Sequence, residues 1–308
     1  MSVALTVILG CTGSGKAALG LELARRTGGE IISLDSMKVY RRMDIGTAKP
    51  SPRVQAEIPH HLIDVIEPSA DFSVAQFVSF AEQAIADITR RRQRVFVVGG
   101  TPMFLKALTE GLFEGPGADP ELRMRLQAEA RDRGAGVLHE KLAVVDAAAA
   151  KRIHPNDLRR IVRALEVHEL TGRSISELQT QWDRQRTRYD CTLIGLRREL
   201  ADQNHRTNER VRRMMDAGLL DEVARLLAEP KPLSRSARQA LGYAESIGHL
   251  EGACTLIEAV ENIKINTRQF AKAQRTWFRR FREVQWIDLQ PDSTARAIAD
   301  DVMTRRDA

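Results

Sequence analysis

The strongest constraint on the fold of this chain is a glycine-rich turn set between an apolar run and a helix-forming segment. Residues 3–9 read VALTVIL, a short run typical of a fully buried strand, and residues 10–17 read GCTGSGKA. The second stretch fits the phosphate-binding loop G-x-x-x-x-G-K-[ST] at seven of its eight positions. Glycines let backbone N–H groups curl around an oxyanion and Lys16 adds a point charge, so the sequence predicts a phosphate site here. The eighth position is Ala17, where a hydroxyl that holds Mg²⁺ is expected.

Strands and helices alternate after this turn. Helices are predicted at 16–26, and at 73–91, where Ser73 and Gln76 form a capping box. The predicted strands, in addition to residues 3–9, are 30–35, 61–66, 94–98, 191–196 and 284–289. This alternation predicts an α/β fold, namely a P-loop NTPase-like parallel sheet with helices on both faces.

A helical region interrupts the α/β pattern. The Gly/Pro-rich hinge at 111–120 ends the alternation, and residues 119–186 read as helical with no clear strand. Within them, Asn156 or Asp157 would begin a helix that Gly172 ends. The sequence therefore predicts a P-loop-type catalytic core formed by residues 1–112 and 190–308, with an inserted all-helical domain at 113–189.

Charge and cysteine content exclude several classes of protein. Lys and Arg together exceed Asp and Glu by 47 to 41, which is compatible with a polyanionic partner. Cys11, Cys191 and Cys254 are few and far apart, so neither a disulfide framework nor a cysteine-based zinc site is expected. The first apolar run is too short for a signal peptide and no stretch approaches a membrane span. We therefore expect a soluble, cytoplasmic protein that does not enter a membrane.

The acids near the predicted phosphate site do not match an ordinary ATPase. Those enzymes usually hold Mg²⁺ with a strand-terminal acid, but the strand at 94–98 ends in Gly99-Gly100-Thr101. Asp35 instead ends the second strand. Since strand ends of an open α/β sheet face the ligand crevice, Asp35 and Thr101 could converge near the loop. An acid beside a phosphate suggests proton abstraction from a nucleophile, and the plainer alternative is that Asp35 only caps a turn.

The segment 267–282, TRQFAKAQRTWFRRFR, is rich in cations and contains no acid. We call the cations that recur along one helical face the basic stripe; they are Arg268, Lys272, Arg275, Arg279 and Arg282. The opposite face would carry Ile263, Phe270, Trp277 and Phe281, and we expect Trp277 and Phe281 to be buried. A stripe of one sign on a core-anchored helix is typical of a surface that follows a nucleic-acid backbone. Arg159, Arg160 and Arg163 form a second basic cluster.

Eight stretches of the sequence, including the phosphate loop and the basic segment described above, occur together in the order found in one enzyme family. They are GCTGSGK, GEIISLDSMKVYRRMDIGTAKP, PHHLIDVIEP, VVGGT, KRIHPNDLRRIVRALEV, MMDAGLLDEV, QALGY and NTRQFAKAQRTWFRRF. They resemble the tRNA dimethylallyltransferases, also called tRNA isopentenyltransferases, from about residue 5 to residue 290. The resemblance implies transfer of a five-carbon group from dimethylallyl diphosphate to N6 of the adenosine immediately 3′ of the tRNA anticodon.

The resemblance also implies roles for individual residues. The loop residues Gly10, Cys11, Thr12, Gly13, Ser14, Gly15, Lys16 and Ala17 would hold the diphosphate leaving group. Arg210 would clamp the same group, Asp35 would be the general base, and Thr101 would hydrogen-bond nearby. The residues expected to contact tRNA are Asp35, Ser36, Met37, Lys38, Thr101, Arg123, Arg159, Arg160, Ile161, Val162, Arg163, Gln239, Gly242, Tyr243, Arg268, Lys272, Arg275 and Arg279.

The expected partner is a tRNA anticodon stem-loop, bound by a monomer whose inserted domain is tRNA-binding. Three sites depart from the family pattern: Ala17 replaces Thr or Ser, Arg159 replaces Gln, and Pro102-Met103-Phe104 replaces Gly-Leu-Tyr, which removes a phenol. Mg²⁺ is the expected metal, bound through diphosphate and water because Ala17 offers no ligand, and its protein ligands stay unknown. His60 and His61 lack companion zinc ligands, so structural hydrogen bonding is expected for them.

Two alternatives stay open. One is an ATP-dependent small-molecule kinase that uses the same loop, against which Ala17 and the missing strand-terminal acid count. The other is a non-catalytic RNA-binding protein on a relic P-loop, which Ala17 supports but the joint presence of Asp35, Thr101 and Arg210 opposes.

Overall fold

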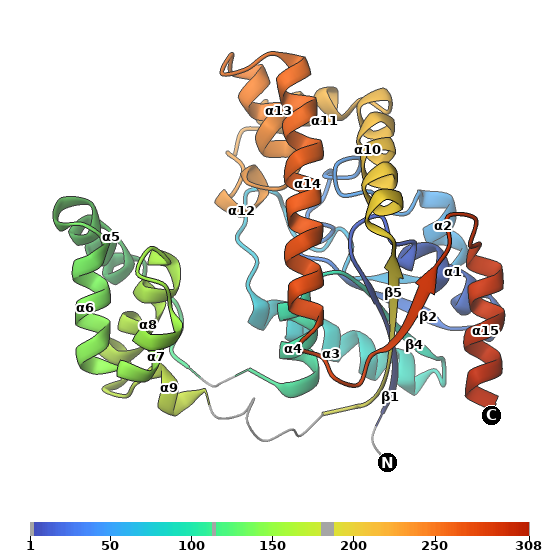
Figure 1. Cartoon of the computed structure of the whole chain (residues 1–308), viewed down its shortest axis with the longest axis horizontal. Coiled ribbons are helices and arrows are strands. Elements are labelled where there is room, and N and C mark those ends of the chain that lie inside the picture. The colour runs from blue at the N-terminus through green and yellow to red at the C-terminus, as the bar shows by residue number, and fades with distance from the viewer. Residues whose placement is uncertain (1–2, 113–114, 180–187, 308) are drawn as a thin grey trace. The chain divides into compact units, whose positions relative to one another are not determined.

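The computed structural model describes residues 3–112, 115–179 and 188–307 (Figure 1). The chain divides into two compact units. The first, which we call the core unit, comprises Met1–Thr109 and Arg188–Ala308, and the second, the helical unit, comprises Glu110–Thr187. Residues 113–114 of the predicted hinge and 180–186 of the predicted helical region lie outside the described residues.

The core unit contains a six-stranded sheet in which every pairing is parallel. Its strands are β1 (Ala4–Gly10), β2 (Glu30–Leu34), β3 (His60–His61), β4 (Val95–Gly99), β5 (Asp190–Arg198) and β6 (Gln285–Leu289). The order across the sheet is β3-β2-β4-β1-β5-β6. β2 and β4 are buried along their whole lengths, including Glu30 and Ser33 of β2, as expected of inner strands covered on both faces. The predicted α/β fold class is confirmed.

Helices α1 (Lys16–Thr27) and α3 (Val74–Arg90) belong to opposite faces of this sheet. The connection from β1 through α1 to β2 runs toward the β3 edge, and the connection from β3 through α3 to β4 runs the other way. Because crossovers between parallel strands are right-handed, the two helices must lie on opposite faces. On the α1 face, α15 (Ala295–Asp307) shares a core cluster with α1 and the sheet. The capping box predicted at Ser73 and Gln76 begins α3.

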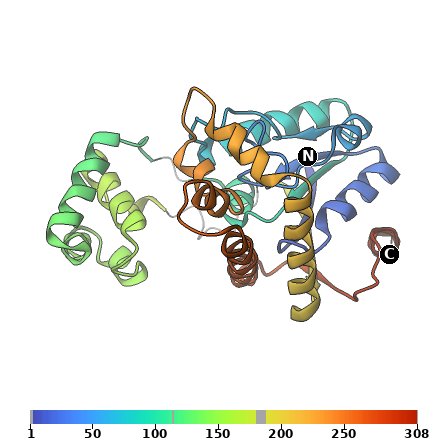
Figure 2. The ribbon, with the colours of Figure 1, turned by 90° about the horizontal axis from the view of Figure 1, so that it is seen from above.

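A second layer of helices stands over the carboxyl ends of the strands. Its long members are α10 (Leu200–Asp216) and α14 (Leu256–Phe278), which pack side by side (Figures 1 and 2). The shorter helices of the core unit are α2 (Pro52–Glu57), α4 (Pro102–Glu110), α11 (Leu219–Leu227), α12 (Arg235–Arg238) and α13 (Tyr243–Leu250). A hydrophobic cluster that includes Tyr40, Val211, Tyr243 and Ile263 joins several of them to the segment that follows β2.

The helical unit contains no strand within its described residues. Its helices are α5 (Pro120–Arg133), α6 (Ala135–Val145), α7 (Ala147–Arg152), α8 (Leu158–Thr171) and α9 (Ile175–Leu178). They enclose a core of their own that includes Leu126, Leu142 and Leu165. Of the two predicted N-caps for α8, Asp157 is the one used, and Gly172 ends the helix in the left-handed conformation with φ 69°.

Two predicted elements are shorter than expected. The strand predicted at 61–66 is reduced to β3, because Leu62 and Asp64 adopt φ values of 62° and 55° that are incompatible with an extended strand. Helix α14 ends at Phe278, so Arg279 is its cap and Arg282 lies beyond it. None of the helices in the described part of the chain is long and apolar enough to cross a membrane.

The predicted apolar face of α14 is also wrong in detail. The helix buries Ile263, Thr267, Ala271, Gln274 and Phe278, a face displaced by one position from the basic stripe rather than opposite to it. Phe270 is 43% exposed, and Trp277 and Phe281 are only half-buried. The hydrophobic pattern is misleading here because two of the buried positions carry polar side chains, which a count of apolar residues places on the outside.

Candidate active site

The sheet brings three of the predicted site segments to one edge. The phosphate loop follows β1, Asp35 follows β2, and Thr101 lies two residues after β4. Since β4 pairs with both β1 and β2, Thr101 follows the strand that separates Asp35 from the loop. The carbonyl of Leu34 accepts hydrogen bonds from the N–H groups of Gly100 and Thr101, at 3.2 and 3.3 Å, and ties the two strand ends together.

The phosphate loop leads directly into α1. Gly15 adopts φ 97° at the N-cap, a conformation that an L side chain would strain, and α1 begins at Lys16. The first N–H groups of a helix have no intrahelical acceptor and attract anions. The ammonium of Lys16 donates to the carbonyl of Cys11 at 3.2 Å. The hydroxyl of Ser14 is buried and has no hydrogen-bond partner within the described residues, which is typical of a site that holds a ligand or water.

Side chains from β5 and α10 hold the outer side of the loop. The consecutive carbonyls of residues 12–14 accept hydrogen bonds from Gln203, from Arg206 at 3.2 Å and from Arg198 at 3.2 Å. Because protein donors occupy these oxygens, the loop turns its carbonyl groups toward β5 and α10 and is organised before an anion binds. No motif in the sequence indicated these three residues. The one signal that could have pointed to Gln203 and Arg206 is that they lie on α10, the helix that also carries the predicted Arg210.

Three cations surround Asp35 electrostatically. The pKa of Lys16 is lowered to about 8, mainly by burial and also by the charge of Arg210, while the carboxylate of Asp35 opposes both effects. Burial likewise lowers the pKa of Arg210 and of Lys38, again against the attraction of Asp35. No salt bridge joins any of the three cations to a carboxylate within residues 3–112, 115–179 and 188–307. We call Lys16, Lys38 and Arg210 the cation cluster; it carries more positive charge than Asp35 can balance.

The carboxylate of Asp35 has a fixed orientation. Its Oδ1 accepts hydrogen bonds from the N–H of Met37 at 2.8 Å and of Lys38 at 3.3 Å, which is the turn-capping arrangement considered as an alternative above. Its Oδ2 receives no hydrogen bond from the described residues. Turn capping and proton transfer are therefore compatible, because the cap uses one oxygen and orients the other.

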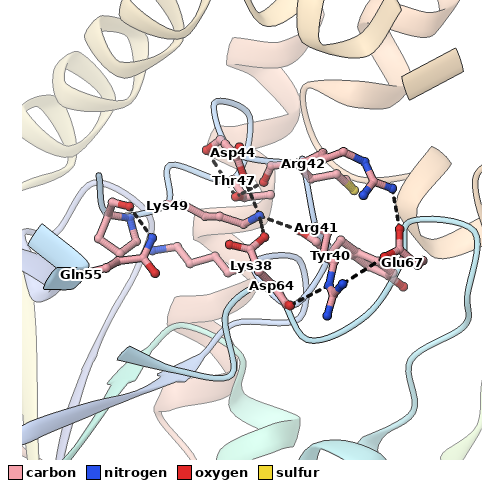
Figure 3. A network of polar contacts seen from close by, with 12 residues as sticks. Lys38, Tyr40, Arg41, Arg42, Asp44, Thr47, Lys49, Gln55, Asp64 and Glu67 are labelled. Atoms are coloured by element: carbon pink, nitrogen blue, oxygen red, sulfur yellow. Dashed lines mark hydrogen bonds and ion pairs between the residues drawn. The ribbon is translucent and has the colours of Figure 1, made fainter. Parts of the chain in front are cut away.

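The segment that follows Asp35 is held by Lys49, whose side chain is only 3% exposed (Figure 3). Its ammonium donates to Asp44 Oδ1 at 2.6 Å, to Asp64 Oδ1 at 2.5 Å and to the carbonyl of Tyr40 at 2.6 Å. The guanidinium of Arg41 adds a hydrogen bond to the carbonyl of Asp64 at 3.0 Å. One cation therefore cross-links both ends of the segment, and this role could not be read from its sequence position.

Glu222 of α11 anchors the same segment from the other side. Its Oε2 accepts hydrogen bonds from the N–H groups of Asp44 at 3.0 Å and Ile45 at 2.8 Å, and its Oε1 accepts one from the hydroxyl of Tyr243 at 2.6 Å. Burial and this hydrogen bond to a carboxylate raise the pKa of Tyr243. Tyr243 is fully buried and has a structural role in the core, while its contact with tRNA stays a prediction.

A cavity of about 580 Å³ adjoins the cation cluster. Arg210, Arg213 and Met214 of α10 line one side, and Ile45 and Lys49 line another. Arg210 therefore belongs both to this cavity and to the charge cluster around Asp35.

The predicted tRNA contacts of the helical unit divide into two groups. Arg159 and Arg160 are exposed on α8, where a polyanion can reach them. Ile161 and Val162 are buried in the core of the unit, and their contact with tRNA stays a prediction. Arg123 and Arg163 both pair with Glu166 through contacts of 2.7 and 2.6 Å; their first role is to neutralise this buried carboxylate.

The predicted contacts of the core unit are also uneven. Gln239, Lys272 and Arg279 are exposed, whereas Gly242 is buried at the start of α13. Ser36, Met37, Lys38 and Thr101 are half-buried. Arg268 donates to Asn208 Oδ1 at 2.7 Å. Burial raises the pKa of the Cys11 thiol, and the guanidinium of Arg275 opposes this shift, so Arg275 stands at the phosphate loop.

Two further predictions concern residues outside the site. His60 Nδ1 hydrogen-bonds the carbonyl of Ile58 and His61 Nε2 contacts Glu30 Oε2, both at 2.7 Å, which is the structural role expected of them. Phe104 is buried and stacks on Phe77 with ring centroids 4.2 Å apart. Phe104 stands where the family has tyrosine, so the loss of the tyrosine hydroxyl at this position affects the packing of the core.

The side chains present do not form a site for a protein-held metal ion. Within the described residues, no three His, Cys, Asp or Glu side chains gather closely enough to hold one. Ala17 is exposed at the start of α1 and offers no oxygen. A divalent cation here would depend on oxygens supplied by a ligand and by water.

A phosphate loop, an unbalanced cation cluster and a carboxylate at the end of β2, which β4 separates from the loop, together define a P-loop-type α/β protein whose loop and carboxylate lie at the same edge of the sheet. Comparisons with known proteins narrow this class. A family model described as IPP transferase matches residues 38–281, and one described as isopentenyl transferase matches residues 3–59. The tRNA dimethylallyltransferase of Geobacter metallireducens is 48% identical over 284 residues, 92% of each chain. That of Symbiobacterium thermophilum is 48% identical over 299 residues, 96% of this chain and 93% of the relative. This chain belongs to the tRNA dimethylallyltransferase family.

Solved structures agree with this assignment. The tRNA isopentenylpyrophosphate transferase of Bacillus halodurans is 38% identical with a TM-score of 0.71, over 99% of this chain and 97% of that one. A eukaryotic dimethylallyltransferase acting on tRNA is 28% identical with a TM-score of 0.80, over 99% of this chain and 80% of that one.

Proposed function

We propose that this protein transfers a dimethylallyl group from dimethylallyl diphosphate to N6 of the adenosine immediately 3′ of a tRNA anticodon and releases diphosphate. The observation that carries the proposal is the cation cluster at the phosphate loop, with the single carboxylate of Asp35 among its charges. Half-buried cations in excess of the acids around them favour the binding of an external anion, and a diphosphate supplies it.

The reaction must remove a proton from the adenine amine and stabilise the negative charge of the departing diphosphate. Different residues of the site perform these two tasks. An exocyclic adenine amine is a weak nucleophile because its lone pair is delocalised into the ring, and it must lose a proton as the new C–N bond forms. The free Oδ2 of Asp35 accepts that proton. The allylic C–O bond breaks and its electron pair leaves with the diphosphate, whose charge is stabilised by Lys16, Arg210 and the loop amides. Thr101, which follows the strand between the two groups, would hydrogen-bond the reacting amine.

We further propose that tRNA is bound through its anticodon stem-loop. The exposed cations Arg159, Arg160, Lys272 and Arg279 would contact phosphates, which position an RNA without reading its sequence. The target base would leave its stack to reach Asp35, as single-stranded loops permit. We expect the protein to act as a monomer in the cytoplasm.

Magnesium stays a proposal of a limited kind. Since Ala17 and the surrounding side chains provide no ligand set, Mg²⁺ would bind through diphosphate oxygens and water. Its contribution would be to neutralise part of the diphosphate charge. The proton transfer to Asp35 does not depend on it.

The experiment that tests the function uses bulk tRNA lacking the modification, with either dimethylallyl diphosphate or ATP. After digestion, mass spectrometry of the nucleosides should show prenylated adenosine. ATP consumption with a phosphorylated acceptor would favour the kinase instead, and RNA binding without chemistry would favour the relic P-loop.

Replacement of the general base gives the sharpest form of this test. Asp35→Asn keeps the acceptor for the turn but cannot take a proton at neutral pH, so transfer should fall by about 10²-fold to 10⁴-fold while tRNA affinity is retained. Asp216→Asn, at an exposed position of α10, is the matched control and should transfer normally. An Asp35→Asn variant that transfers at the normal rate would remove the general-base assignment.

A further inference from the structure

We propose that Gln274 is a positioning residue of the transfer reaction. Its carboxamide joins the phosphate loop to the Gly100–Thr101 turn and so fixes the diphosphate site relative to the site of proton transfer. This inference rests on the proposed function, since it concerns the same reaction.

Gln274 lies in the last third of α14 and is 4% exposed. Its Oε1 accepts a hydrogen bond from the N–H of Thr12 at 3.0 Å, and its Nε2 donates one to the carbonyl of Gly100 at 2.6 Å. Thr12 belongs to the phosphate loop, and Gly100 precedes Thr101 at the end of β4. One side chain from a remote part of the sequence thus forms hydrogen bonds through both of its polar atoms to the backbone of two segments of the active site.

The packing around Gly100 shows that this contact is built into the fold. A Cβ at Gly100 would lie 2.5 Å from Gln274 Nε2 and 3.5 Å from Cε of Lys16. Glycine therefore lets the carboxamide approach the strand end closely, beside the lysine of the cation cluster. The second glycine of the family stretch VVGGT, Gly100, is therefore needed in this chain because Gln274, from the stretch NTRQFAKAQRTWFRRF, packs against it.

The chemistry of the carboxamide suits the position. A single planar group must accept from one N–H and donate to one C=O, which glutamine does and glutamate, leucine or methionine do not. Loss of the carboxamide would leave a buried donor and a buried acceptor unpaired. Gln203 of α10 donates to the carbonyl of Thr12, so two buried glutamines from adjacent helices hold the two sides of this residue.

A positioning role makes a prediction that a purely structural role does not. Gln274→Met has a similar volume and neither hydrogen bond. With both substrates saturating, kcat should fall by roughly tenfold to a hundredfold because the two halves of the site lose their alignment. Pyrophosphate affinity, measured by calorimetry without turnover, should fall severalfold, and tRNA affinity should not change. Gln269→Met, an exposed position on the same helix, is the matched control and should alter none of these.

A double-mutant cycle tests whether Gln274 acts through Thr101. If it does, Gln274→Met should reduce kcat much less in a Thr101→Val background than in the original chain. Should the methionine variant not fold, Gln274→Glu serves the same cycle, since it keeps the acceptor for Thr12 and lacks the donor for Gly100. Fully additive losses, or a fall in unfolding temperature with kcat and pyrophosphate affinity unchanged, would overturn the inference. Failure of the proposed function is a separate result, visible as the absence of prenylated adenosine with the unaltered protein.

Discussion

The two units of this protein both place cations beside a carboxylate, but they balance the charges differently. In the helical unit, Arg123 and Arg163 share Glu166, which is fully buried and also accepts a hydrogen bond from the N–H of Asp119 at 2.8 Å. These contacts lower the pKa of Glu166 against the effect of burial. In the core unit, Lys16, Lys38 and Arg210 face Asp35 without forming a salt bridge to any acid among the described residues.

The difference separates charges that stabilise the fold from charges that await a ligand. A buried carboxylate with matched cations and hydrogen bonds is satisfied within the protein, and breaking the set is costly. A buried cation without a matched acid raises the free energy of the folded protein until an anion binds. The number of ion pairs that each cation forms, rather than the number of arginines, therefore indicates where the protein can bind an anion.

The largest expected effect comes from removing an unmatched cation. Arg210→Met should lower kcat/KM for dimethylallyl diphosphate by about 10²-fold to 10³-fold, because a charge that stabilises the leaving group is lost. The unfolding temperature should stay the same or rise, since a desolvated charge without a salt-bridge partner is removed. Arg212→Met, at an exposed position of the same helix, is the control and should change neither. A variant that loses stability and activity together would mean that Arg210 belongs to the fold.

The matched set in the helical unit should give the opposite result. Glu166→Gln removes the charge that both arginines share, and we expect the free energy of unfolding to fall by about 2 kcal/mol, the scale of a charged hydrogen bond. Urea unfolding followed by circular dichroism measures this. Transfer at saturating tRNA should be retained. Glu169→Gln removes a carboxylate from an exposed pair with Arg125 and should cost less than about 1 kcal/mol. Equal losses in the two variants would contradict the comparison.

The sequence predicts the parts of the site that local motifs encode. The phosphate loop needs glycines and a lysine at fixed spacing, and strand ends of a parallel sheet converge by topology, so Lys16, Asp35 and Thr101 could be placed near one another before the structure was known. The α/β alternation, the helix cap at Ser73 and the choice between Asn156 and Asp157 as the cap of α8 were likewise predictable, because each depends on residues close together in the chain.

The residues that hold the site together could not be predicted in the same way. Gln203, Gln274 and Glu222 each contact backbone groups at least 174 positions away in the sequence. Lys49 acts over shorter separations, up to the 15 positions to Asp64. A polar residue inside an amphipathic helix carries no local mark of its partner. The same limit applies to Tyr243: its family motif predicts a contact with tRNA, and the sequence alone does not show that its side chain is buried in the core. A sequence motif identifies the segment that belongs to the site. The burial and the hydrogen-bond partners of each residue then determine its role within that segment.

The pH dependence of anion binding sharpens the view of Lys16 as an unmatched charge. Its pKa is lowered to about 8 by burial and by Arg210, with Asp35 opposing, so the ammonium is charged below this value and neutral above it. Pyrophosphate affinity should therefore fall by up to about tenfold between pH 7 and pH 9. Since arginine keeps its charge throughout, Lys16→Arg should show a flatter profile, and comparing the two variants cancels the titration of pyrophosphate itself. Parallel profiles would show that Lys16 does not titrate in this range.

The smallest expected effect concerns the alanine that ends the phosphate loop. In phosphate loops that end in Ser or Thr, the hydroxyl holds a metal ion that helps to neutralise the bound anion. If the cation cluster neutralises the anion in this protein, a hydroxyl at position 17 should add a metal ligand without being essential. Ala17→Thr should lower the Mg²⁺ concentration that half-saturates pyrophosphate binding by about fivefold, the effect of roughly 1 kcal/mol. Ala18→Thr, at the next exposed position of α1, is the matched control and should leave the Mg²⁺ dependence unchanged. An unchanged Mg²⁺ requirement in Ala17→Thr would mean that residue 17 does not face the metal in the bound complex, and that the cation cluster alone, rather than the lost hydroxyl, determines how this site neutralises its anion.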